Sequence, residues 1–176
     1  MESTTSVGLE APQGGELPFD ALYRACAGDL YAYVAALVRE RAAAEDVTAQ
    51  AFERAFRRRG TYDARRGTQR AWLFGIARNA ALDELRRRRR TARLAADPAD
   101  VDATAGDDAE AAVRRATVRA ALAGLEARDR ELIALRFHAG LTTAEIASVL
   151  RISPSNASTR VHRALTRLRE ACHATT

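Results

Sequence analysis

The residues best suited to chemistry in this sequence are arginines interleaved with aromatic side chains. Five consecutive arginines stand at positions 86–90, and they follow Arg65, Arg66, Arg70 and Arg78 together with Tyr62, Trp72 and Phe74. The planar guanidinium fork pairs well with phosphate, and an aromatic face can stack on an unpaired base. Positions 62–90 are therefore predicted to bind a polyanion that offers both phosphates and bases.

The arginine run and the aromatic residues also have simpler structural interpretations. Arginines at the end of a helix can form a solvated positive cap that interacts with the helix dipole. A tryptophan at the start of an apolar helical stripe is more often part of a core, so Trp72 is expected to be mainly buried. Tyr62, or the loop after it, is then the more exposed candidate for stacking. Phosphate binding is favoured because the run covers every face of the helix, which packing alone does not require.

A second group of polar residues follows a helix-turn-helix pattern near the end of the sequence. Thr142 and Glu145 fit a capping box, and Ser153 followed by Pro154 fits the start of the next helix. In this motif the second helix can enter the major groove of duplex DNA. The outward positions are Ser155, Asn156, Ser158, Thr159 and His162, followed by Arg160, Arg163 and Arg167 as phosphate partners. An ordinary helical hairpin with a solvated polar face is the alternative.

No catalytic or metal-binding pattern stands out in the sequence. The three histidines lack metal-ligand spacing, and Cys26 and Cys172 lie far apart without a CxxC motif. The glycines form no phosphate-cradling loop, and no nucleophile elbow is present. The chain is therefore predicted not to be an enzyme and to need no metal or cofactor. Each cysteine is expected to be a small apolar filler.

Composition and charge fit a folded protein with a polyanionic partner. The 176 residues are 47% hydrophobic and 29% charged, with a net charge of +5 and a pI of about 10.0. The first 16 residues have no arginine and no apolar core, so they do not resemble a signal peptide. No stretch approaches the roughly 20 apolar residues that span a bilayer. A cytoplasmic protein without membrane insertion is expected.

The periodicity of apolar residues predicts an all-α chain. Helices are expected at about 19–39, 43–58, 70–90, 113–125, 129–138, 143–150 and 153–171, with a loop at 61–69. Residues 95–112 contain no basic residue and six acidic ones, which is typical of a linker. The prediction is a disordered tail at 1–16 and two small helical domains at 17–92 and 113–172. A flexible acidic linker at 93–112 joins them, and the second domain contains the helix-turn-helix.

Two blocks in the first predicted domain resemble a known family. Residues 44–56, which begin AEDV and end FERAF, and residues 72–87, which begin WLFGIARN and end DELRR, are similar to motifs of bacterial RNA polymerase sigma factors. The similarity is to the extracytoplasmic-function class of the sigma-70 family, and it covers about 19–90 and 113–170. It implies a promoter-specificity subunit that binds core RNA polymerase, recognises the minus-ten and minus-thirty-five promoter elements and aids promoter melting.

The resemblance also assigns roles to individual residues. Expected to bind the clamp helices of the largest polymerase subunit are Glu45, Asp46, Val47, Gln50 and Phe52. Expected at the minus-ten element, where a base of the non-template strand is flipped out, are Tyr62, Arg65, Arg66, Gln69, Arg78, Asn79, Arg86 and Arg87. Expected at the duplex minus-thirty-five element are Ser155, Asn156, Ser158, Thr159, Arg160, His162 and Arg163.

Further partners follow from the same resemblance. They are the flap region of the polymerase and an anti-sigma factor that holds the subunit inactive. No obligate homo-oligomer is expected. In the family, the segment that matches the acidic linker is a tether that runs through the polymerase.

Two other classes of function stay open. A stand-alone DNA-binding regulator would use only the helix-turn-helix and would usually need a dimer, for which no heptad seam is present. A nucleic-acid-modifying enzyme would need a catalytic cluster. Specific promoter binding without core polymerase would favour the regulator, and turnover of nucleic acid by the isolated chain would favour the enzyme.

Overall fold

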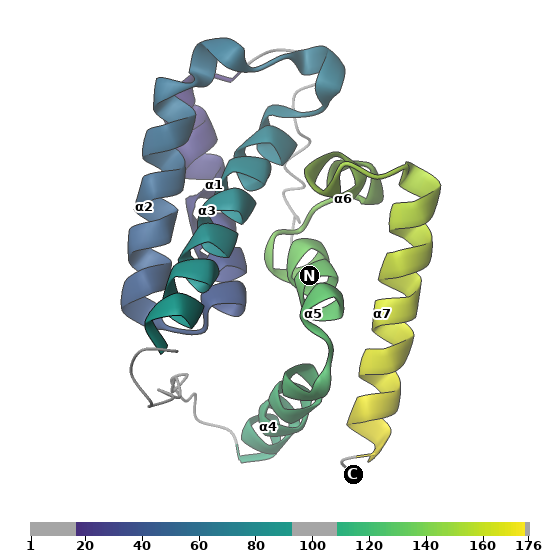
Figure 1. Cartoon of the computed structure of the whole chain (residues 1–176). Coiled ribbons are helices and arrows are strands. Elements are labelled where there is room, and N and C mark those ends of the chain that lie inside the picture. Colours follow the sequence, from purple (N-terminus) through teal and green to yellow (C-terminus); the bar gives the residue numbers. More distant parts are fainter. Residues whose placement is uncertain (1–16, 93–108, 175–176) are drawn as a thin grey trace, which may run out of the picture.

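The structure is a computed structural model that describes residues 17–92 and 109–174, and all regular structure within these ranges is helical. The first half contains α1 (Phe19–Val38), α2 (Arg41–Arg57) and α3 (Gln69–Ala92). The second half contains α4 (Ala109–Gly124), α5 (Ala127–Ile133), α6 (Thr143–Leu150) and α7 (Pro154–Ala174). The predicted all-α fold is confirmed. Figure 1 shows the first three helices packed side by side, with α6 beside the start of α3 and α7 along the outer edge.

Apolar side chains three or four residues apart give α1 its buried face. Leu22, Cys26, Leu30 and Val34 are each at most 2% exposed. The helix ends at Arg39, whose φ of 57° is left-handed and whose N–H donates to a carbonyl one turn back. Glu40 then starts α2, because its carboxylate accepts hydrogen bonds from the first backbone N–H groups of that helix.

Alanines line the contact between α2 and α3. Ala44 and Ala51 of α2 and Ala77 and Ala81 of α3 are completely buried. Small side chains let two helix axes approach closely, and larger residues then fill the space around them. The ring of Phe74 does so, with its centroid 5.6 Å from that of the Tyr33 ring. The result is a rigid three-helix support for the loop between α2 and α3.

The second half uses local signals to make short helices. α5 continues into a π-helical segment, Ala134–His138, and the chain then turns at Gly140 with a φ of 61°. α6 begins at the predicted capping box, where the side chains of Thr142 and Glu145 each bind the other's backbone N–H. α4 begins at Ala109, four residues before the expected start at 113. The predicted tail and most of the predicted linker, 93–108, lie outside the described residues.

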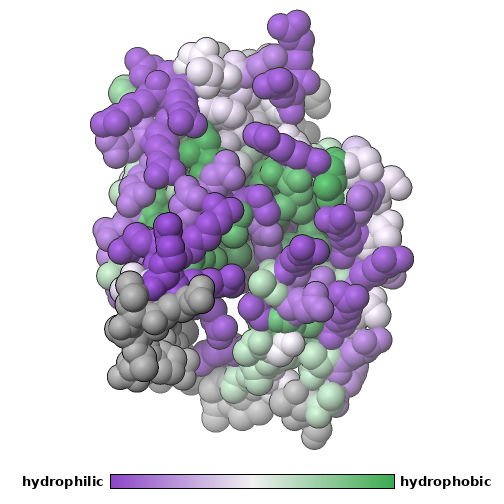
Figure 2. All heavy atoms as spheres, viewed as in Figure 1, coloured by the Kyte–Doolittle hydropathy of each residue, from purple (hydrophilic) through white to green (hydrophobic). Residues whose placement is uncertain are grey.

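The two halves share one core. A single cluster of buried apolar side chains runs from Leu22 in α1 to Ala164 in α7. Contacts between α3 and α6, and between α1 and the π-helical segment, join the halves. Figure 2 shows hydrophilic side chains over most of one face, with hydrophobic atoms visible between the halves. The two predicted domains are therefore packed against each other, which the sequence did not indicate.

Candidate nucleic-acid interface

The loop that joins α2 to α3, residues 58–68, is held in shape by its own hydrogen bonds. Asp63 caps a short turn by accepting from the N–H of Arg65 at 3.0 Å, and the Tyr62 hydroxyl donates to the Gly67 carbonyl at 3.1 Å. Gly67 has a φ of 143°, which a side chain rarely tolerates. The α2–α3 loop therefore presents its arginines and Tyr62 from a defined backbone.

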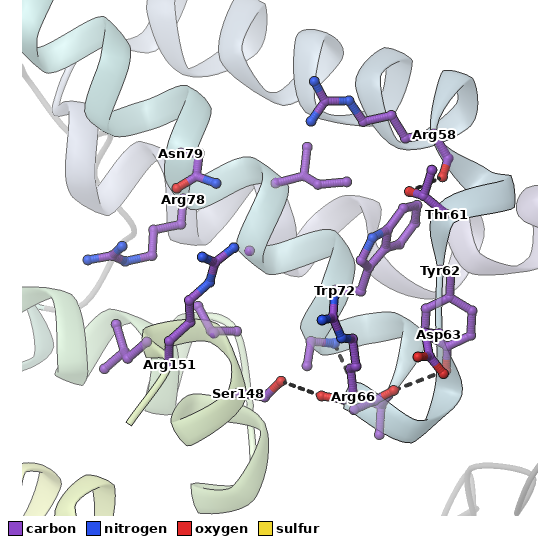
Figure 3. A pocket seen from close by; sticks show the side chains of 17 residues that line it. Arg58, Thr61, Tyr62, Asp63, Arg66, Trp72, Arg78, Asn79, Ser148 and Arg151 are labelled. Atoms are coloured by element: carbon purple, nitrogen blue, oxygen red, sulfur yellow. Dashed lines mark hydrogen bonds between the residues drawn. The ribbon is translucent and has the colours of Figure 1, made fainter. Parts of the chain in front are cut away.

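A cavity of about 930 Å³ lies between this loop, α3 and α6 (Figure 3). The rings of Tyr62 and Trp72 stand along it with centroids 5.8 Å apart. Both side chains are half-buried, so Trp72 is less completely buried than expected. Asn79 of α3 and Arg151 at the end of α6 also line the cavity. Aromatic faces and guanidinium groups here offer stacking and phosphate pairing in one place.

The residues predicted for the minus-ten element divide into three groups. Lining the cavity are Tyr62, Arg66, Arg78 and Asn79. Arg65 extends into solvent with its side chain 93% exposed, and Gln69 instead binds the backbone N–H and carbonyl of Leu17 at 2.9 and 3.1 Å. Arg86 and Arg87 lie nearly five turns along α3 from the loop. The structure brings together only part of the predicted set.

The arginine run is partly neutralised by carboxylates of the chain itself. Arg86 pairs with Asp83, and Arg87 pairs with Glu84, at 2.8 Å each. Arg88 bridges Glu84 to Glu40 at the start of α2. Hydrogen bonds from Arg87, and then from Arg88, lower the pKa of Glu84. This end of α3 is thus both a structural tie between helices and a positively charged surface.

Three polar contacts tie the α2–α3 loop and α3 to the second half. Arg78 donates to both carboxylate oxygens of Glu131 at 2.6 and 3.3 Å. The Thr68 hydroxyl donates to Glu145 at 2.8 Å. Ser148 donates to the backbone carbonyl of Arg66 at 3.1 Å, a bond that is visible in Figure 3.

A fourth tie between the halves is made by Arg70. This arginine, counted above among the candidate phosphate partners, pairs with Asp29 at 2.6 Å and also donates to the Ala139 carbonyl. It therefore serves the packing of the molecule. Glu131 was missed by the sequence reasoning, and the available signal was an acid within the apolar run of a short helix.

The residues predicted to bind polymerase are split between the surface and the core. Glu45, Asp46 and Gln50 are exposed on α2. Val47 and Phe52 are only 2% and 7% exposed, because they face α1 and α3. Direct contact of these two side chains with the polymerase stays a prediction, and little of either side chain reaches the surface. They support the exposed surface from beneath.

All seven positions predicted to meet duplex DNA are exposed. They are Ser155, Asn156, Ser158, Thr159, Arg160, His162 and Arg163, on the solvent side of α7. Ala157 and Ala164 on the opposite side are completely buried, which fixes the rotation of the helix. Ser153 caps α7 by accepting from the N–H of Asn156 at 3.2 Å. Arg167, also a predicted phosphate partner, pairs instead with Asp129.

Cys26 lies in the core of the first half and does not reach this surface. Burial raises the pKa of its thiol, so it stays protonated, and its sulfur accepts a hydrogen bond from Arg70 at 3.6 Å. Among residues 17–92 and 109–174, no cluster of His, Cys, Asp and Glu has the makings of a metal site. The helices in these ranges are too short or too polar for any of them to span a membrane.

Comparisons with known proteins match both halves of the chain. The family model for Sigma-70 region 2 matches residues 22–91, and that for Sigma-70 region 4 matches residues 121–170. The ECF RNA polymerase sigma factor SigL of Mycobacterium tuberculosis is 34% identical over 155 residues, which is 85% of each chain. The RNA polymerase sigma factor CarQ of Myxococcus xanthus is 35% identical over 160 residues, which is 89% of this chain and 90% of CarQ.

Solved structures share the fold. The sigma factor RpoE in complex with the anti-sigma factor NepR, from Bartonella quintana, gives a TM-score of 0.72 over 87% of this chain and 95% of RpoE, at 23% identity. CnrH in complex with the cytosolic domain of CnrY gives 0.66 over 90% and 89% of the two chains, at 24% identity. With relatives above 30% identity that cover most of both chains, this chain belongs to the extracytoplasmic-function sigma factors of the sigma-70 family, the promoter-recognition subunits of RNA polymerase.

Proposed function

We propose that this sigma factor divides promoter recognition between its halves. The α2–α3 loop and the adjoining part of α3 bind the minus-ten element as a melted strand, and α7 binds the minus-thirty-five element as duplex. The observation that carries the proposal is the cavity beside Tyr62 and Trp72, which combines stacking surfaces with arginines. A captured base offsets part of the stacking and pairing that melting removes.

The exposed face of α2 binds core polymerase in this proposal. Glu45, Asp46 and Gln50 offer two carboxylates and an amide on one surface, and buried side chains hold that surface rigid. The clamp helices of the largest subunit are the proposed partner, and the flap region is proposed to hold the second half. Since its partners are polymerase and promoter DNA, the protein acts in the cytoplasm. It initiates transcription without a catalytic group or cofactor of its own.

An anti-sigma factor is the proposed negative regulator. RpoE and CnrH, which share this fold, were solved with NepR and CnrY respectively.

The test is run-off transcription with purified core polymerase on a set of promoters that includes the one upstream of this chain's own gene. Wild-type protein is expected to start transcripts at a subset of these promoters. Arg160→Ala is expected to reduce transcription several-fold, since one phosphate contact is lost. Arg169→Ala is the matched control, because Arg169 is exposed nearer the C-terminal end of the same helix. Specific promoter binding without core, together with no core-dependent transcript, would instead identify a stand-alone regulator.

A further inference from the structure

The face of α3 that lines the cavity has a gap in its middle. Trp72, Gly75, Ile76 and Asn79 all line the cavity, and residues at this spacing lie on one side of a helix. The order along the face is an indole ring, a position without a side chain, a branched alkyl group and an amide. Two turns of helix, a rise of about 10 Å, separate Trp72 from Asn79. Figure 3 shows both side chains on this stretch of α3.

Neither packing nor backbone conformation requires glycine at position 75. A Cβ atom there would meet nothing within 4 Å, and the residue lies inside the helix Gln69–Ala92. A glycine in a helix interior weakens the helix relative to alanine. Gly28 in α1 is equally open, but it does not line the cavity. An open glycine alone therefore indicates no role, and the position of Gly75 beside Trp72 is what distinguishes it.

The indole ring at one end of the gap is held in place by the α2–α3 loop. The Tyr62 ring lies against it with centroids 5.8 Å apart and planes at 57°. The Tyr62 hydroxyl is itself fixed, because it donates to the Gly67 carbonyl at 3.1 Å. A ring that is already positioned loses little conformational freedom when a ligand stacks on it. Trp72 is thus a preorganised stacking surface.

A gap between an indole and an amide suits a nucleobase that lies against the helix backbone. Glycine lets a ligand approach the backbone closely. A pyrimidine stacked on Trp72 would leave position 75 uncovered, whereas the second ring of a purine extends over it. The Asn79 side chain is exposed and offers both a donor and an acceptor. Adenine presents the matching pair on one edge, N6 as donor and N7 as acceptor.

We propose that Gly75 determines base specificity in strand recognition, because its missing side chain admits an adenine that stacks on Trp72 and pairs with Asn79. The inference rests on the proposed function, since it names the base that the strand-binding surface selects. Trp72 supplies the stacking face, Asn79 reads the base edge, and Gly75 sets the size limit. A side chain at position 75 would occupy the space of the second purine ring.

Two substitutions fill the gap in steps. Gly75→Ala adds one methyl group, and Gly75→Val adds a branched side chain whose rotamer in a helix is nearly fixed, so it cannot swing aside. Both are better helix formers than glycine, and Gly75→Ala is expected to raise the folding equilibrium constant about fivefold. Gly28→Ala and Gly28→Val are the matched controls, because they make the same changes at an open helical glycine outside the cavity. Urea denaturation checks the stability of all four.

Binding is measured by fluorescence anisotropy of fluorescein-labelled single strands, with the full chain alone and in complex with core polymerase. One strand is all thymine, and the second carries a single central adenine. Wild type is expected to bind the adenine strand about tenfold more tightly. Gly75→Val is expected to bind the two strands equally, with Gly75→Ala between it and wild type. Both Gly28 variants are expected to keep the wild-type preference.

Stacking is followed separately with an unlabelled thymine strand in which 2-aminopurine, a fluorescent purine, replaces the central adenine. Wild type and the Gly28 variants are expected to quench its emission, because the base lies against the Trp72 ring. Gly75→Val is expected to leave the emission close to that of the free strand. A variant that merely disturbed the fold would lose affinity for the thymine strand as well.

The outcomes separate this inference from the proposed function. If Gly75→Val keeps the preference for adenine and the quenching, Gly75 does not set the size of the base and the inference is wrong. If wild type supports core-dependent run-off transcription but does not prefer adenine to thymine, the inference fails and the proposed function stands. If the preference is present and is lost in Gly75→Val, but no form supports run-off transcription, the proposed function fails and the role of Gly75 stands.

Discussion

Glu45, Asp46 and Gln50 stand in solvent on α2, above the buried side chains of Val47 and Phe52. The two carboxylates are the charged part of the proposed polymerase surface. Replacing both Glu45 and Asp46 with Ala is expected to reduce recovery of core polymerase in a pull-down about tenfold, since interface charges commonly contribute more than 1 kcal/mol together. Asp20→Ala is the control, because Asp20 is exposed on α1. Unchanged recovery of core polymerase with the double variant would show that polymerase does not bind this face of α2.

Tyr33 carries a buried hydroxyl that makes no hydrogen bond of normal geometry among the described residues, although the Glu131 carboxylate lies nearby. Burial raises the pKa of this phenol well above its usual range, so it stays neutral. An unsatisfied buried polar group costs about 1–3 kcal/mol. Tyr33→Phe is therefore expected to leave the free energy of unfolding unchanged or to raise it by about 1 kcal/mol. Urea denaturation measures this, with Tyr31→Phe as control, and a clear loss of stability would indicate a hidden partner.

At the scale of elements, Glu84 joins α3 to the start of α2 through Arg88 and Glu40. Its pKa is lowered in the folded protein, chiefly by the hydrogen bond from Arg87. A lowered pKa contributes stability above the ordinary value of 4.5, and this contribution is lost as the pH falls below it. Glu84→Gln is expected to destabilise by about 1 kcal/mol at neutral pH and by less in acid.

Urea denaturation of the Glu84 variant at pH 7 and near pH 3 checks this difference. Asp83→Asn provides the comparison, because the Asp83 and Arg86 side chains are 58% and 67% exposed and such pairs contribute little. If the two variants lose the same free energy of unfolding at neutral pH, Glu84 contributes no more than an exposed ion pair, and its role in joining α3 to α2 is wrong.

The start of α6 depends on its capping box. Thr142→Ala removes the acceptor for the Glu145 N–H and is expected to lower the free energy of unfolding by about 1 kcal/mol. Thr143→Ala changes the same side chain one residue later, inside the helix, and is expected to be neutral or slightly stabilising. Thermal denaturation of both variants distinguishes a cap from a general effect of losing threonine.

The features that the sequence predicted correctly are those set by local signals. α6 was predicted to its first residue because a capping box is a local signal, read within four positions around Thr142 and Glu145. The same holds for the exposed face of α7, whose apolar spacing fixes which side chains face water. The burial of Val47 and Phe52 was not predicted, since a motif match does not separate side chains on a surface from those beneath it. The Arg78–Glu131 pair joins residues 53 positions apart, and no periodicity reports such a contact.

At the scale of the whole molecule, the two halves pack around one shared core, and the two candidate DNA surfaces differ in their exposure to solvent. The α7 face is open to solvent, while the α2–α3 loop is exposed over most of its length and contacts α6 through the Arg66 carbonyl and Thr68.

Salt is expected to act differently on the contact between the two halves and on DNA binding. The Arg78–Glu131 pair is mostly shielded from solvent, so added ions screen it weakly. Phosphate contacts weaken linearly with the logarithm of salt concentration. In KCl titrations, the Trp72 emission of the free protein is expected to change little while its affinity for single-stranded DNA falls by about tenfold or more. A red shift of Trp72 in parallel with the lost affinity would contradict this.

The shielding of that one ion pair has a consequence for the range of ionic strength over which the two halves stay in contact. Added ions screen the exposed Arg86–Asp83 pair before they screen Arg78–Glu131, so the contact between the halves is expected to persist at salt concentrations that already weaken phosphate contacts.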